Sequence, residues 1–194
     1  MARVKLIDPE QAEGRTHEVF ERVKAYYKMV PGLQLALNYL PETTDALWTL
    51  SLNTAMEGNI REELKRVFFA VTAYEVECEY CTAAHMLALL GKQWSRQECV
   101  EVIEGKPSAR LSDKDNAAVN FARIVGRRPA AVTDQMTDDL RNIGWTDAEI
   151  VEIVASVALM RYTSTVASAL DVPLEAAMEG VGVNCGVPLD RRDT

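Results

Sequence analysis

Apolar residues recur at helical spacing along most of the chain. In the segment 19–27 they lie one, three and four positions apart, which places them on one face of a helix. The same spacing predicts further helices at residues 47–56, 60–74 and 78–90. Glycine or proline interrupts the pattern between these segments, at Pro31-Gly32, Gly58 and Gly91.

Helix starts in the second half of the chain carry capping signals. Ser95 with Glu98, and Thr146 with Glu149, have the spacing of a capping box, in which side-chain oxygens accept hydrogen bonds from free backbone N–H groups. Ser112 begins a weaker version of the same pattern. The helix from Thr146 is the longest and reaches about residue 170, whereas segment 127–133 is a connection. Because no window shows convincing strand alternation, we predict an all-α fold of eight to ten helices.

Length and composition indicate one domain over residues 1–194, with a loose, glycine-rich tail at 180–194. The 21 basic residues against 29 acidic ones give a net charge of −8, which argues against binding nucleic acid or an anionic membrane surface. The first residues form no apolar secretory signal, and no uncharged run is long enough to span a bilayer. We therefore expect a cytoplasmic protein without membrane contact.

The strongest chemical signal is the string Cys78-Glu79-Tyr80-Cys81-Thr82-Ala83-Ala84-His85. Three residues of a helix turn the chain by about 300° and four by about 400°. The side chains of Cys78, Cys81 and His85 are therefore expected on one face. Glu75 would extend this face if the helix continued backwards.

This spacing suits thiol redox chemistry. Two cysteines three positions apart at a helix start can close a disulfide with little movement, and the free N–H groups there stabilise a thiolate. His85 can accept the thiol proton of Cys81 or donate a proton to a leaving oxygen. A thiolate that attacks a hydroperoxide becomes a sulfenic acid, which a second cysteine converts into a disulfide.

Two other interpretations of the cysteine pair stay open. A zinc site of two cysteines and His85, completed by Glu75 or a water, fits the spacing, although the chain has only two histidines and no second C-x-x-C. The cysteines can also be small buried apolar residues. We favour redox chemistry because both cysteines and the histidine share one face.

The C-x-x-C-x-x-x-H string after an apolar helix resembles the AhpD-like branch of the carboxymuconolactone decarboxylase superfamily. Two later segments extend the likeness, Ile143-Gly144-Trp145-Thr146-Asp147-Ala148-Glu149-Ile150 at a helix start and Ala167-Ser168-Ala169-Leu170-Asp171-Val172-Pro173-Leu174 at a helix end. The resemblance covers about residues 35–178 and is greatest to the peroxidase-related members. The decarboxylase branch lacks the cysteine pair, so the pair argues against lactone decarboxylation.

The resemblance implies an all-helical homo-oligomer (dimer, trimer or hexamer) that reduces organic hydroperoxides and needs no metal or organic cofactor. It makes Cys81 the peroxide-attacking cysteine, Cys78 the resolving cysteine and His85 part of the proton relay. It also implies a dithiol electron donor, either a lipoyl- or a thioredoxin-like protein. A thiol–disulfide oxidoreductase and a non-enzymatic redox sensor are the alternatives.

One position departs from the family pattern. The family has a Glu twelve residues before the first cysteine, where this sequence has Arg66. We hypothesise that Glu62, Glu63 or Glu75 replaces the missing carboxylate while Arg66 stabilises the thiolate. An ordinary surface pair between Arg66 and Glu62 fits equally well. Tyr80 can hydrogen-bond a peroxide or, as we favour, cover the site with its ring.

Several other residues fit structural roles. We expect Glu175 to be an ordinary surface charge and Cys99 to be a packed thiol. The sequence leaves the role of Cys185 open. The tryptophans are expected to anchor the core or an interface, at Trp48, Trp94 and Trp145.

Overall fold

The computed structural model describes residues 2–179 and 181, and in these residues it is all-helical. Two short 3-10 helices, at Pro9–Gln11 and Pro129–Ala131, accompany the α-helices. The α-helices are α1 (Gly14–Tyr27), α2 (Gly32–Leu37), α3 (Pro41–Met56), α4 (Glu62–Glu75), α5 (Glu79–Gly91), α6 (Arg96–Ile103), α7 (Asp113–Arg127), α8 (Asp134–Asn142), α9 (Asp147–Ala169) and α10 (Ala176–Glu179). The ten α-helices in the described residues confirm the predicted fold class.

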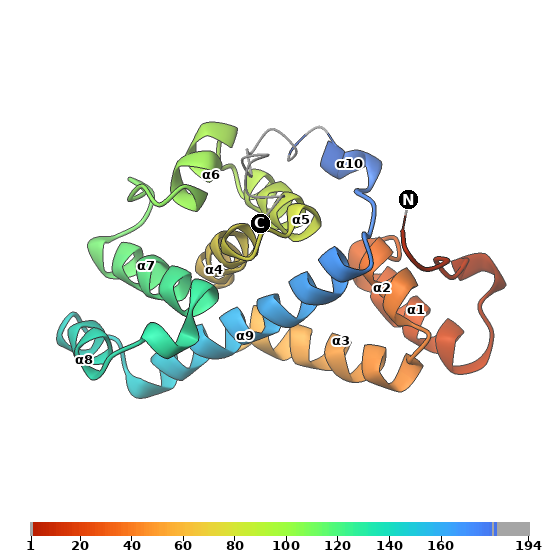
Figure 1. Ribbon diagram of the computed structural model, residues 1–194, viewed down its shortest axis with the longest axis horizontal. Coiled ribbons are helices and arrows are strands. Elements are labelled where there is room, and N and C mark those ends of the chain that lie inside the picture. The colour runs from red at the N-terminus through yellow and green to blue at the C-terminus, as the bar shows by residue number, and fades with distance from the viewer. Residues whose placement is uncertain (1, 180, 182–194) are drawn as a thin grey trace.

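Helix α4 is the centre of the fold. All residues from 64 to 73 are buried, so the helix is covered on every side rather than on one face. It packs against α5, α7 and α9. Figure 1 shows α7 and α8 at one end of the molecule and α1, α2 and α3 at the other, with α4 and α5 between them.

Helix α9 links the two ends of the molecule, as Figure 1 shows. By length and composition it is apolar enough to cross a bilayer, which the sequence analysis did not expect. Half of its most apolar window is buried inside the fold, however, which is the usual position of a core helix. It contacts α3, α4, α5 and α7, as expected of a helix central to the core.

The capping patterns in the sequence predicted helix starts that the structure contains. Capping boxes form at Ser95, Ser112 and Thr146. The sequence pattern did not predict three short helices, α2, α8 and α10. Helix α1 ends at Tyr27, with Lys28 as its left-handed C-cap residue, before Pro31 is reached, and Pro31 is instead the N-cap residue of α2. The predicted tail at 180–194 lies outside the described residues except for Val181.

Candidate active site

The cysteine pair lies at a tight junction between two buried helices. The backbone N–H of Cys78 donates to Ala73 O at 2.9 Å, and that of Glu77 donates to Tyr74 O at 3.1 Å. These two bonds form a Schellman motif, with Glu77 at φ 58° in the left-handed position. Cys78 is then the N-cap residue of α5. Since α5 begins after this turn, Glu75 belongs to α4 and does not extend the face of α5 that carries the cysteines.

The thiol of Cys78 is placed where a helix start favours a negative charge. Its Sγ accepts the backbone N–H of Cys81 at 3.2 Å. Hydrogen bonding from the Cys81 side chain and backbone lowers the pKa of Cys78 to about 7, and Ser164 and Ser168 of α9 act in the same direction. Cys78 is fully enclosed, with an exposed fraction of 0%.

The pKa of the Cys81 thiol is shifted in the opposite direction, upward. Its hydrogen bond to Cys78, together with burial, raises the pKa of Cys81 well above the usual value. Of the two thiols, Cys78 is therefore the one that ionises more readily, and Cys81 is the one that keeps its proton to higher pH. Cys81, unlike Cys78, lines a cavity. The sulfur with access to a substrate is thus the one that holds the proton.

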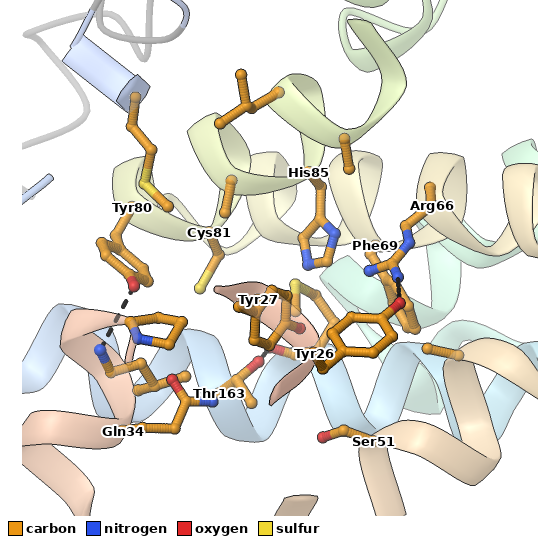
Figure 2. A pocket seen from close by; sticks show the side chains of 18 of the residues that line it. Tyr26, Tyr27, Gln34, Ser51, Arg66, Phe69, Tyr80, Cys81, His85 and Thr163 are labelled. Carbon is orange, nitrogen blue, oxygen red and sulfur yellow. Dashed lines mark hydrogen bonds between the residues drawn. The ribbon is translucent and has the colours of Figure 1, made fainter. Parts of the chain in front are cut away.

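The cavity has a volume of about 350 Å³ and lies between α5 and the helices α1, α2, α3 and α9. That volume suits a small organic molecule. Figure 2 shows Cys81 and His85 projecting from α5 into this space, with Tyr26 and Tyr27 among the residues around it. Most of the wall is apolar or aromatic, with Phe69 contributed by α4.

His85 lies one turn after Cys81, partly buried in the cavity wall. Burial and the nearby charge of Arg66 lower the pKa of His85 to about 3, so the imidazole is neutral at physiological pH. Its Nδ1 atom is buried and has no hydrogen-bond partner within the described residues. Its ring packs against Phe69 with the centroids 5.0 Å apart.

Arg66 also reaches the cavity, from α4. Its guanidinium pairs with Glu62 Oε1 at 3.2 Å and donates to the Tyr26 hydroxyl at 3.5 Å. Glu62 in turn accepts a hydrogen bond from Lys92 at 2.8 Å. Although burial opposes it, the hydrogen bond from Lys92 and the charge of Arg66 lower the pKa of Glu62. The pair of Arg66 and Glu62, which was the alternative to a replacement carboxylate, is therefore present, although Arg66 is a buried residue rather than a surface one.

The other two candidate carboxylates are held elsewhere. Glu63 accepts the indole N–H of Trp94 at 2.6 Å, and Glu75 pairs with Arg123 of α7. Neither lines the cavity. Of the three acids suggested by the sequence, Glu62 alone lies beside Arg66.

Tyr80 lines the cavity next to Cys81, but its hydroxyl is engaged. It donates to Glu175 Oε1 at 2.7 Å and accepts the N–H of Leu33 at 3.4 Å. Glu175 was expected to be an ordinary surface charge, and that was wrong. It is partly buried and lines the cavity, as Gln34 of α2 does. Nothing in the local sequence around Gln34 or Glu175 indicated this, because α2 and the segment before α10 meet only in the folded chain.

The remaining expectations concern metals and packed residues. No group of three or more metal-ligating side chains converges among the residues that the structure describes. Cys78, Cys81 and Cys99 are buried, and Cys99 is packed in the core as expected. Cys185 lies outside the described residues. The tryptophans expected to be anchors are all buried, at Trp48, Trp94 and Trp145.

The fold has close counterparts among solved structures. One is a peroxidase-related protein from Ralstonia eutropha, described as an alkylhydroperoxidase AhpD core, with a TM-score of 0.81 over 91% of this chain and 94% of that one. The chain has the AhpD-like fold. The sequence identity to this AhpD-like neighbour is 18%.

Two further AhpD-like neighbours extend the comparison. A peroxidase-related protein from Silicibacter sp. matches with a TM-score of 0.76 and 22% identity, over 92% of this chain and 94% of that one. The debrominase Bmp8 matches with a TM-score of 0.77 and 20% identity, over 91% of this chain and 94% of that one. A cysteine-to-alanine variant of Bmp8 was solved with 2,3,4-tribromopyrrole. No known family profile and no curated protein sequence matches the chain.

Proposed function

We propose that this protein is a cysteine-dependent reductase of organic hydroperoxides. One observation carries the proposal. Cys81 lines an apolar cavity, and hydrogen bonds from the Cys81 side chain and backbone lower the pKa of the enclosed Cys78 thiol behind it to about 7. A two-cysteine peroxidase needs an accessible sulfur that can become a thiolate and a second cysteine that closes the disulfide.

The first half-reaction starts with a proton transfer inside the pair. Cys78 is ionised and accepts a hydrogen bond from Cys81, so the Cys81 proton can pass to Cys78 without a change in net charge. The Cys81 thiolate then attacks the terminal oxygen of the hydroperoxide. The O–O bond breaks, Cys81 becomes a sulfenic acid, and the departing alkoxide takes up the proton that Cys78 had accepted, which gives an alcohol and restores the Cys78 thiolate.

The second half-reaction closes the disulfide. The Cys78 thiolate attacks the Cys81 sulfur, and hydroxide leaves as water after it takes up a proton. In total, one hydroperoxide and two thiols give one alcohol, one water and one disulfide. A dithiol protein of lipoyl or thioredoxin-like type would return the two electrons by thiol–disulfide exchange. No step requires a metal or an organic cofactor.

His85 acts in this scheme as a neutral hydrogen-bonding group rather than as the base that takes the thiol proton. Its pKa of about 3 makes it a poor proton acceptor near neutral pH. One imidazole N–H can still donate to the oxygen that departs. Arg66, in place of the carboxylate of the family pattern, provides positive charge near the site of the developing alkoxide.

The decisive experiment counts free thiols after one equivalent of cumene hydroperoxide is added to reduced protein. We expect wild type to lose two thiols rapidly. We expect Cys78→Ser to accumulate a trappable sulfenic acid at Cys81, whereas Cys99→Ser behaves like wild type. Survival of all thiols would contradict the proposal. A fast reaction with small disulfides would then favour a thiol–disulfide oxidoreductase, and a change of oligomeric state on oxidation would favour a redox sensor.

A second candidate function is reductive removal of bromine from an aromatic ring. The aromatic walls of the cavity favour a flat ring, and one neighbour of similar fold is a debrominase. The same pair supplies the two electrons, because one aryl bromide and two thiols give one arene, one bromide, one proton and one disulfide. Bromide release from 2,3,4-tribromopyrrole by the reduced protein, measured beside thiol loss on hydroperoxide, separates the two functions.

A further inference from the structure

The cavity contains buried polar atoms that the proposed chemistry does not use. Within the described residues, Gln34 Oε1 and Glu175 Oε2 are buried without a hydrogen-bond partner, and both residues line the cavity. Both atoms are acceptors. Leaving a buried acceptor unpaired costs about 1–3 kcal/mol, so a ligand that supplies a donor there gains affinity.

The carboxylate of Glu175 is held in a fixed position. Its Oε1 accepts the backbone N–H of Gly32 at 2.7 Å and the hydroxyl of Tyr80 at 2.7 Å. The glycine permits this close approach, because a Cβ at Gly32 would lie 3.0 Å from a methyl carbon of Val172 and 3.4 Å from Glu175 Oε1. With Oε1 fully used, Oε2 is the oxygen available to a ligand.

Gln34 lies two residues after Gly32 in α2, so both acceptors belong to the same end of the cavity. Figure 2 shows Gln34 and Tyr80 on one side of Cys81, and His85 and Arg66 on the other. Tyr80 and His85 are five residues apart on α5, which corresponds to roughly 7.5 Å along its axis. The cavity therefore has an acceptor end, a central sulfur and a cationic end.

We propose, on the basis of the function proposed above, that the natural substrate is a small, mostly apolar molecule with a hydroxyl or ring N–H group remote from its reactive bond. That group donates its hydrogen to Gln34 Oε1 or Glu175 Oε2, the two unpaired acceptors at this end of the cavity. The apolar body lies across Cys81, and the reactive bond meets its sulfur. Gln34 and Glu175 are thus specificity-determining residues of this site.

The two acceptor oxygens of Gln34 and Glu175 disfavour ligands that bring a different chemical group to this end of the cavity. A carboxylate or phosphate would place its own acceptors against two acceptors and would leave all of them unpaired. A purely apolar molecule would fill the volume but would leave both oxygens without donors. Phenols and pyrroles fit better than either, because they combine an apolar ring with one hydrogen-bond donor for one of the two oxygens.

The test compares the binding of two unreactive probes, 4-ethylphenol and 4-ethylanisole, to reduced protein by isothermal titration calorimetry. The probes differ in that the anisole has lost the donor hydrogen. We expect wild type to bind the phenol at least about tenfold more tightly, as expected from one well-made buried hydrogen bond.

Two variants locate this preference in the cavity. Gln34→Met removes one acceptor at similar volume, and Glu175→Gln can keep the oxygen that bonds Gly32 and Tyr80 while turning the other atom into a donor. We expect each variant to reduce the preference for the phenol severalfold and the double variant to abolish it. Ser51→Ala, which changes another polar residue of the cavity wall, should retain it. Thermal unfolding checks that each variant is folded.

Equal affinity of wild type for the two probes would overturn this inference. A phenol preference that survives in both Gln34→Met and Glu175→Gln would also overturn it, because the donor would then bind elsewhere. Neither probe reacts with thiols. The result is therefore independent of thiol loss on hydroperoxide, and each proposal can fail without the other.

Discussion

Cys78 occupies two structural positions at once. It is the residue that completes the C-terminal motif of α4 and the N-cap of α5. Caps are normally Ser, Thr, Asp or Asn, whose side-chain oxygen accepts a backbone N–H. Here a sulfur accepts it at 3.2 Å, so the local interaction that starts the helix also stabilises a thiolate. The two cysteines therefore differ in their properties. Cys78 is the one that ionises more readily, and Cys81 is the one that lines the cavity and can meet a substrate.

This separation predicts the pH dependence of the reduced protein. The pKa of Cys78 is lowered from 9.0 to about 7, so its thiolate is present above pH 7 and is lost as the pH falls through that value. We expect the ultraviolet thiolate absorbance of wild type minus that of Cys78→Ser to show one ionisation per chain with a midpoint near pH 7. Cys99→Ser should leave this difference signal unchanged, and a midpoint near the ordinary cysteine value would contradict the assignment.

At the scale of the helices, α4 and α9 are joined by a buried ion pair. Lys65 of α4 is fully buried and pairs with Glu152 Oε1 of α9 at 2.5 Å. Glu152 also accepts the backbone N–H groups of Asn59 and Ile60, in the turn between α3 and α4. One carboxylate therefore ties that turn and α4 to α9, and this holds the helix that carries Arg66 against the cavity.

Removing one partner of this pair should be costly. We expect Glu152→Gln to lower the free energy of unfolding by about 3–5 kcal/mol, because it leaves the Lys65 ammonium buried without a counter-charge. Lys65→Met should cost less, and the double variant should cost less than the sum of the single ones. Urea unfolding measures these values. Arg141→Gln, which breaks an exposed pair with Asp147, serves as the control with a change below about 1 kcal/mol. Additive effects of the two buried changes would contradict this account.

At the scale of the whole molecule, α9 has an uncharged face that the rest of the described chain leaves exposed. Val151 is 66% exposed, and Val154 and Tyr162 are also well exposed. Exposed alanines at 155 and 158 lie between them. At about 100° per residue, all of these positions fall in one stripe along the helix. Contiguous apolar stripes of this kind are typical of contact surfaces between subunits.

We predict that this stripe is the contact between copies of the chain in a homo-oligomer. Light scattering after size-exclusion chromatography should give a multiple of the chain mass for wild type. The double variant Val154→Asp/Tyr162→Asp should shift it to the monomer mass, because charges in an apolar interface are costly. Ile143→Asp changes an exposed apolar residue outside α9 and should have no effect. A monomeric wild type would show that this stripe does not hold copies of the chain together.

The sequence alone was sufficient for features that depend on neighbours in the chain. Helical spacing and capping boxes involve residues three or four positions apart, so the helix starts at Ser95, Ser112 and Thr146 were predictable. The same local rule placed Cys78, Cys81 and His85 together at the start of α5. The AhpD-like fold, expected from the motif around these residues, is confirmed by the solved structures.

Tertiary structure decided which groups face the substrate and in which protonation state. Gly32 and Glu175 are hydrogen-bonded across 143 positions of sequence, and no local pattern encodes such a contact. The same holds for Glu63 and Glu75, which lie outside the site because Trp94, between α5 and α6, bonds to Glu63 and Arg123 of α7 pairs with Glu75. Burial and the charge of Arg66 make His85 neutral. These properties depend on distances and desolvation between segments far apart in the sequence, and they exist only once the chain is folded.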